Sequence, residues 1–79
     1  MRPPKHARRL LQRLGAEIRH RREKRGHSQE QLAKKAGVHR NVIGRTERGV
    51  YNPTVLTLKA ISAALGISIS MLLEGAAKR

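Results

Sequence analysis

The segment QEQLAKKAGVHRNVIGRTERG, residues 29–49, decides the fold. Apolar residues recur at helical spacing in both halves of this segment, and Gly37 separates the two halves. Ala33 is small enough to let two helix backbones cross closely, Gly37 ends the first helix, and Ile43 anchors the second helix on the first. The pattern predicts a helix-turn-helix, whose second helix carries polar side chains on a rigid outward face.

Helical spacing continues on both sides of this segment. Before it, the apolar residues from Ala7 onward predict a helix that stops near Gly26. Ser28 and Gln31 then form a capping box for the first helix of the segment. After it, Thr54 is a suitable N-cap for a fourth helix. The residues expected to face inward from that helix are Leu56, Ile61, Ala64 and Leu65.

A short fifth helix over residues 69–75 completes the pattern. The sequence therefore predicts an all-α fold, a compact five-helix helix-turn-helix domain. Its expected divisions are a flexible basic arm over residues 1–6, the helix-turn-helix domain over 7–75 and a short tail over 76–79.

The composition limits both the core and the partners. The chain has 79 residues, no Cys, and Tyr51 as its single aromatic residue, so the core must consist of Leu, Ile, Val and Ala. One aromatic ring also leaves little for base stacking, which argues against a single-strand binder. The net charge of +13 indicates a polyanionic partner, with nucleic acid as the first choice, and ten of the 18 basic residues lie in residues 1–27.

Several function classes lack support in the sequence. There is no paired-carboxylate constellation, no thiol and no Gly-rich phosphate loop, so we expect no enzymatic activity and no cofactor. No apolar run reaches the roughly 20 residues of a membrane span, and no secretory signal is visible, so a cytoplasmic protein is expected. The four histidines have no metal-ligand spacing, and no metal is expected at His6, His20, His27 and His39.

Two consecutive runs carry a resemblance to a known family. They are RREKRGHSQEQLAKKAGVHRNVIGRTERG, residues 21–49, and NPTVLTLKAISAALGISISMLL, residues 52–73. Over about residues 14–75 the chain resembles the Xre-type, lambda-repressor-like helix-turn-helix DNA-binding regulators. The resemblance implies that the second helix of the motif enters the major groove of double-stranded DNA.

The resemblance implies two sets of DNA contacts and one ion pair. Arg pairs bidentately with guanine O6 and N7, and Asn with adenine N6 and N7. The positions that read base edges in the family correspond to His39, Arg40, Asn41 and Arg45. The positions that contact phosphates correspond to Ser28, Gln29, Arg48, Tyr51 and Asn52. An internal salt bridge is implied between Arg22 and Glu47.

The sequence departs from the family pattern at several half-buried positions. Arg21, His27 and Thr46 stand where aliphatic residues or Met are common, which predicts a smaller core than is typical. His39 is not a favoured N-cap. Gly44, inside the second helix of the motif, costs roughly 1 kcal/mol relative to Ala.

The last helix predicts an apolar dimer face at Ile69, Met71 and Leu72. Two copies would read a palindrome whose half-sites are spaced about 34 Å apart. The leading hypothesis is a sequence-specific transcriptional regulator, similar to restriction–modification controller proteins and small phage repressors, that acts as a homodimer on a palindromic operator. It would be bacterial or phage-encoded and nucleoid-associated. The alternatives are a non-specific nucleic-acid-binding protein, the antitoxin of a toxin–antitoxin pair, and a membrane-surface role for the basic first helix.

Overall fold

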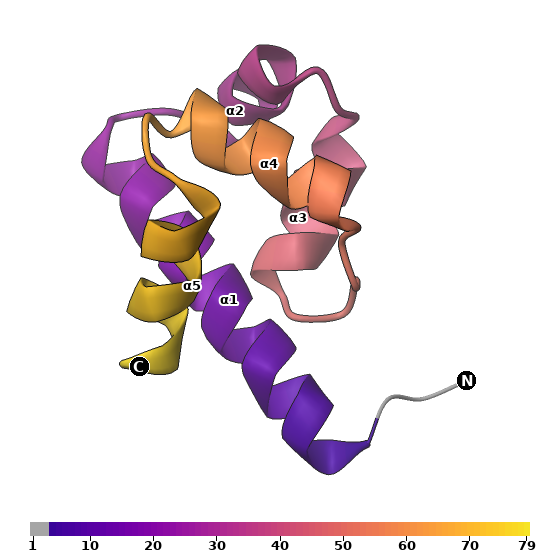
Figure 1. The fold of residues 1–79 in the computed structure, drawn as a ribbon. Coiled ribbons are helices and arrows are strands. Elements are labelled where there is room, and N and C mark those ends of the chain that lie inside the picture. Colours follow the sequence, from indigo (N-terminus) through magenta and orange to yellow (C-terminus); the bar gives the residue numbers. More distant parts are fainter. Residues whose placement is uncertain (1–3) are drawn as a thin grey trace.

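Five α-helices joined by short turns make up the computed structural model, which describes residues 4–79 (Figure 1). The sequence prediction of an all-α, five-helix fold is confirmed, and residues 4–79 contain no strand. Helix α1 packs against α3 and α5, and α2 packs against α3 and α4. The five helices are α1 (Lys5–Lys24), α2 (Gln29–Ala36), α3 (Arg40–Glu47), α4 (Val55–Ala64) and α5 (Ile69–Ala77).

The ends of the helices follow signals in the sequence. At α2, the Ser28 Oγ accepts from the Gln31 backbone N–H at 3.0 Å, and the Gln31 Oε1 accepts from the Ser28 backbone N–H at 2.8 Å, so the capping box is complete. The same helix ends at Gly37, whose φ of 70° lies in the left-handed region that favours glycine. Thr54 caps α4 by accepting from the backbone N–H of Thr57 at 3.1 Å.

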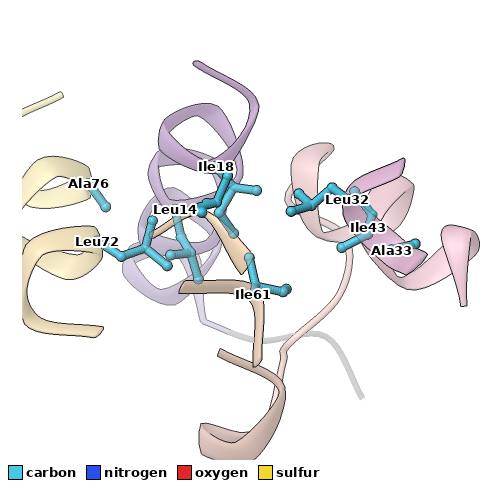
Figure 2. Packing of buried hydrophobic residues seen from close by; sticks show 9 residues of the cluster. Leu14, Ile18, Leu32, Ala33, Ile43, Ile61, Leu72 and Ala76 are labelled. Carbon is cyan, nitrogen blue, oxygen red and sulfur yellow. The ribbon is translucent and has the colours of Figure 1, made fainter. Parts of the chain in front are cut away.

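Each helix contributes a fully buried aliphatic side chain to one core. Ile18, Leu32, Ile43, Ile61 and Leu72, one from each helix in order, have 0% exposure. Figure 2 shows the side chains of α1 and α4 between those of α2 and α3 on one side and those of α5 on the other. Since no helix buries enough apolar surface alone, this shared core fixes the position of α3 relative to α1.

Two apolar residues do not lie where the sequence analysis placed them. Leu72 is wrong as part of a dimer face, because it lies with Ala76 on the inner face of α5 and is 0% exposed. Leu56, expected to face inward, is 81% exposed. The inner stripe of α4 runs through Ile61 and Leu65, and Leu56 lies five residues before Ile61, on another face of the helix.

Helices α1 and α5 extend further than the sequence predicted. Helix α1 begins at Lys5 and so includes the last part of the expected arm, whereas residues 1–3 of that arm lie outside the described residues. At the other end, α5 continues to Ala77, and Ala76 is fully buried. The Nε of Arg79 also donates to Glu17 Oε1 of α1 at 2.8 Å, which ties down the segment expected to be a tail.

Of the three polar departures from the family pattern, two form side-chain hydrogen bonds and the third leaves a buried nitrogen without a partner. The Nε of Arg21 donates to Glu17 Oε2 at 2.6 Å. Thr46 is buried, and its hydroxyl donates to the backbone oxygen of Val42 at 2.6 Å, which satisfies the polar group within its own helix. The Nδ1 of His27 is buried and has no hydrogen-bond partner among residues 4–79.

Within residues 4–79, no single helix has both the length and the apolar character needed to cross a membrane. By length and composition alone, only α4 and α5 taken together would reach that threshold, and the chain bends by 95° between them.

Candidate nucleic-acid interface

Helix α3 has a buried side and an exposed side. Ile43 and Thr46 face the core with 0% and 1% exposure. Arg40, Asn41 and Arg45 are all exposed on the other side. The helix therefore holds three long polar side chains toward solvent from a backbone that the core fixes in place.

The N-terminus of α3 is capped by an unusual residue. His39 is extended at φ −70° and ψ 144°, and its Nδ1 accepts from the backbone N–H of Asn41 at 3.0 Å. The imidazole thus takes the place of the Ser or Thr oxygen that usually caps a helix. Because Nδ1 is used in the cap, Nε2 is the ring atom of His39 that remains for a DNA partner.

An open hollow of about 480 Å³ lies between the first residue of α2 and the outer face of α3. Three arginines and no carboxylate line it, so it suits an anionic partner. Its floor is Gly44, where an added Cβ would lie 3.4 Å from Gln29 Oε1. The lining residues are Gln29, Arg40, Asn41, Gly44, Arg45 and Arg48.

This hollow joins residues from both sets of contacts implied by the sequence. Arg40, Asn41 and Arg45 come from the expected base-reading set, and Gln29 and Arg48 come from the expected phosphate set. The other expected residues lie outside the lining, and they are Ser28, His39, Tyr51 and Asn52.

A buried ion pair fixes α3 against α1. The Nε and Nη2 of Arg22 donate to the two carboxylate oxygens of Glu47 at 2.6 and 3.0 Å, so the pair predicted from the sequence is present and bidentate. The side chains are only 11% and 3% exposed. Hydrogen bonding to Glu47 raises the pKa of Arg22 above its usual value, against the opposing effect of burial. The remaining nitrogen, Nη1, donates to the backbone oxygen of His27 at 2.8 Å.

The same carboxylate also positions Gln29, which the sequence analysis did not foresee. The Nε2 of Gln29 donates to Glu47 Oε1 at 3.0 Å, so one carboxylate links α1, α2 and α3. An amide nitrogen carries two donor hydrogens, and Glu47 uses one of them. Gln29 therefore enters the hollow already oriented, with one N–H left for a phosphate oxygen.

Close approach of α1 and α3 depends on Gly15, a residue that the sequence analysis passed over. A Cβ at this position would collide with the backbone oxygens of Thr46 and Glu47. Any larger residue would therefore push the last turn of α3 away from α1 and disturb the pair between Arg22 and Glu47. The signal that could have found it is a glycine within a helix, which usually has a packing reason.

The loop after α3 contributes an orienting contact. The guanidinium of Arg45 lies over the ring of Tyr51, with 5.8 Å between its Cζ and the ring centroid. A cation over an aromatic face at this distance is attracted to it and loses part of its rotamer freedom. Tyr51 therefore positions Arg45, a role that is separate from the phosphate contact expected for its hydroxyl.

Metal chemistry has no visible site in the described part of the chain. Residues 4–79 contain no group of three His, Asp or Glu side chains that could hold a metal ion together.

Comparison with known proteins decides the family. The model of the helix-turn-helix family HTH_3 matches residues 18–72, which span α2, α3 and α4 and parts of the two outer helices. The chain belongs to the helix-turn-helix family HTH_3. This is a non-enzymatic family of DNA-binding transcription regulators of the Xre-like type, as the sequence resemblance had indicated.

Individual relatives agree with this assignment. The immunity repressor protein of Bacillus phage phi105 is 42% identical over 57 residues, which is 72% of this chain and 40% of that protein. The chain thus spans less than half the length of this relative. The crystal structure of the clp gene regulator ClgR from Corynebacterium glutamicum matches with a TM-score of 0.83 and 30% identity, covering 87% of this chain and 73% of that one.

A second solved structure matches nearly over its whole length. The restriction–modification controller protein C.AhdI from Aeromonas hydrophila has a TM-score of 0.77 and 34% identity, and the match covers 78% of this chain and 94% of that one. That protein is therefore little longer than the part of it that matches this chain.

Proposed function

We propose that this chain binds double-stranded DNA sequence-specifically, as a homodimer on a palindromic operator, and regulates transcription in the cytoplasm of a bacterium, from a bacterial or phage gene. In this proposal α3 lies in the major groove. Its base-reading residues are His39, Arg40, Asn41 and Arg45, and its phosphate contacts come from Ser28, Gln29, Arg48, Tyr51 and Asn52.

The observation that carries the proposal is the arginine-lined hollow between α2 and α3. Gln29 and Arg48 both reach its floor, 3.4 and 3.8 Å from where a Cβ on Gly44 would lie, and would contact the sugar–phosphate backbone beside an inserted helix. Arg40, Asn41 and Arg45 project from α3 itself. In such a complex the phosphate contacts set the register of the protein on the duplex, and the base-edge contacts give specificity.

Pre-organisation supports specific rather than diffuse binding. Arg45 is held over Tyr51, Gln29 is held by Glu47, and α3 is fixed by a buried core and a bidentate ion pair. Side chains that are ordered before binding lose less conformational entropy when they bind. A protein that used only its charge would have no need for these contacts.

The homodimer part of the proposal now rests on a reduced apolar surface. With Leu72 in the core, Ile69 and Met71 remain as the proposed dimer face. Met71 is 48% exposed, and the neighbouring Leu73 is 42% exposed. An exposed large apolar side chain such as Met71 suits burial against a second copy, whereas Leu73 lies two residues on and therefore on another side of the helix.

Selection from random duplex DNA at two salt concentrations tests the proposal. Recovery of one palindromic consensus at near-physiological salt is the expected result. The net charge of +13 favours a second candidate, a non-specific nucleic-acid-binding protein. That candidate predicts no enriched sequence and a steep loss of all binding as salt rises. A pool that stays random at both salt concentrations would therefore refute the proposed operator binding.

A further inference from the structure

The N-terminal half of α1 forms a basic helical projection. Five cationic or ionisable side chains are exposed between residues 5 and 13, whereas the first carboxylate of the chain is Glu17. Figure 1 shows this half of α1 leaving the body of the domain. The matched family region begins only at residue 18. The exposed residues are Lys5, His6, Arg8, Arg9 and Arg13.

The projection is electrostatically unfavourable without a partner. Lys5, Arg9 and Arg13 follow one another at four-residue spacing, which places like charges next to each other on the helix surface. The four ion pairs within residues 4–79 use arginines at position 19 and beyond, so none of them relieves this repulsion. A nearby polyanion would offset it.

One face of the projection continues the proposed DNA interface. The loop after α3 rests on α1 at Gln12, because a Cβ on Gly49 would lie only 2.8 Å from Gln12 Cα. Residues three and four apart share a helix face, so Arg8 lies one turn before Gln12 on that face, and Lys5 lies one turn before Arg8. Lys5 and Arg8 therefore extend from the loop that carries Arg48, Tyr51 and Asn52.

We propose that Lys5 and Arg8 bind the DNA sugar–phosphate backbone next to the segment read by α3, and thereby lengthen the site that one subunit covers. The inference rests on the proposed function, because it assumes that the loop after α3 faces a duplex. From Gln12 to Lys5 the helix advances about 10 Å, which corresponds to roughly three base pairs of duplex. The contact adds affinity and carries no base preference.

A pair of double variants with equal net charge tests this inference. Lys5→Gln/Arg8→Gln removes the two proposed contacts. Arg13→Gln/Lys24→Gln removes two exposed cations that lie roughly 100° and 120° around the same helix from Gln12. Gln keeps the helix propensity of the residues it replaces, and circular dichroism checks that both variants retain the helical content of the wild type.

Affinity is measured on the selected duplex as a function of salt. We expect the Lys5→Gln/Arg8→Gln variant to bind roughly tenfold more weakly near physiological salt, with a log–log salt slope reduced by about 1.8. The Arg13→Gln/Lys24→Gln variant should stay within about twofold of the wild type, because only long-range attraction is lost. Trimming four flanking base pairs should weaken the wild type and leave the Lys5→Gln/Arg8→Gln variant unchanged.

Equal losses in the two double variants would overturn the inference, because net charge alone would then explain them. It would also be overturned if the Lys5→Gln/Arg8→Gln variant kept its DNA affinity but lost binding to vesicles containing phosphatidylserine, which would assign the projection to a membrane surface. If selection yields no consensus, the proposed function fails first. The same comparison is then made on mixed-sequence duplex, where the same difference between the variants is expected.

Discussion

Helices α3 and α5 are both short and both pack on α1. Each is also linked to α1 by an ion pair, and the two ion pairs differ in burial. At α3 the carboxylate of Glu47 meets Arg22 of α1, and both side chains are nearly inaccessible to solvent. Just after α5 the charges are exchanged: α1 supplies the carboxylate of Glu17, and Arg79 supplies the guanidinium. The side chain of Arg79 is 35% exposed. The pair in which both side chains are buried holds the helix proposed to read DNA, and the pair of buried Glu17 with the more exposed Arg79 holds the end of the chain.

Charge and burial explain why the two ion pairs should differ in their contribution to stability. Removing one partner of a buried pair leaves the other charge without compensation in a poorly solvated place. Water can replace the partner of an exposed charge, so the loss is smaller. The comparison therefore predicts that α3 is much more sensitive than α5 to loss of its carboxylate.

The largest expected effect follows from this difference. Glu47→Gln should lower the free energy of unfolding by about 3 kcal/mol, because Arg22 keeps its charge and loses its counter-ion. The matched variant Glu17→Gln should cost about 1.5 kcal/mol, since Arg21 and Arg79 can turn to solvent. Urea denaturation of both variants measures this, and equal losses would show that burial does not distinguish the two ties.

The second expected effect concerns the faces that the helices present. Asn41→Ala and Arg45→Ala should each reduce discrimination at one base position by about 2 kcal/mol, because each would remove the bidentate base contact proposed for that side chain. Lys78→Ala, which removes an exposed cation just after α5, should leave base preference unchanged. Gln29→Ala should weaken all sequences about equally. Binding to a panel of single-base operator variants provides the measurement, and uniform weakening by both Asn41→Ala and Arg45→Ala would contradict the assigned reading face.

The third prediction tests whether the exposed side of α5 is an interface. Met71→Glu should raise the dimer dissociation constant at least tenfold, or about 1.4 kcal/mol, because it places a charge among apolar contacts. Ser70→Glu is the control on the same helix, and Ser70 is also exposed. Sedimentation velocity over a concentration series reports the change. A dimer that resists Met71→Glu would place the contact between subunits elsewhere.

The smallest expected effect is a pH dependence of the tie at α5. Although burial raises the pKa of Glu17, hydrogen bonds from Arg21 and Arg79 outweigh it and hold the pKa below its usual value of 4.5. The stabilisation is therefore complete above about pH 4.5 and is lost as the pH falls through the lower folded-state value. Thermal unfolding of the wild type and Glu17→Gln from pH 7 to pH 3 measures this. The difference in melting temperature between the two proteins should narrow only below about pH 4.5. A difference that is constant with pH would contradict the ion pair.

The same two helices show how far sequence reasoning reached. In α3, the buried positions of Ile43 and Thr46 and the outward positions of Arg40, Asn41 and Arg45 follow from helical periodicity. The pair between Arg22 and Glu47 was available only through resemblance to a family. Which nitrogen of Arg22 pairs with which oxygen of Glu47, and the hydrogen bond from Gln29 to Glu47, depend on side-chain geometry. Helical periodicity does not specify that geometry.

In α5 the sequence was a poorer guide. Four large apolar residues lie within residues 69–73, so several faces of the helix look suitable for the core, and the position of α1 decides between them. This is why the sequence pattern alone places Leu72 on a dimer face, although the residue lies in the core. The contact between Glu17 and Arg79 joins residues 62 positions apart and depends on where the last helix ends, which no local pattern encodes.

The central claim is that Arg45 touches a base edge in the major groove, and a chemical change on the DNA tests it most directly. Replacing the guanine at the position that Arg45→Ala affects by 7-deazaguanine removes the N7 acceptor alone. If Arg45 binds that guanine, the replacement weakens the wild type, has little effect on Arg45→Ala, and yields a coupling energy of at least about 1 kcal/mol. Losses that add independently at every guanine of the operator would contradict the claim.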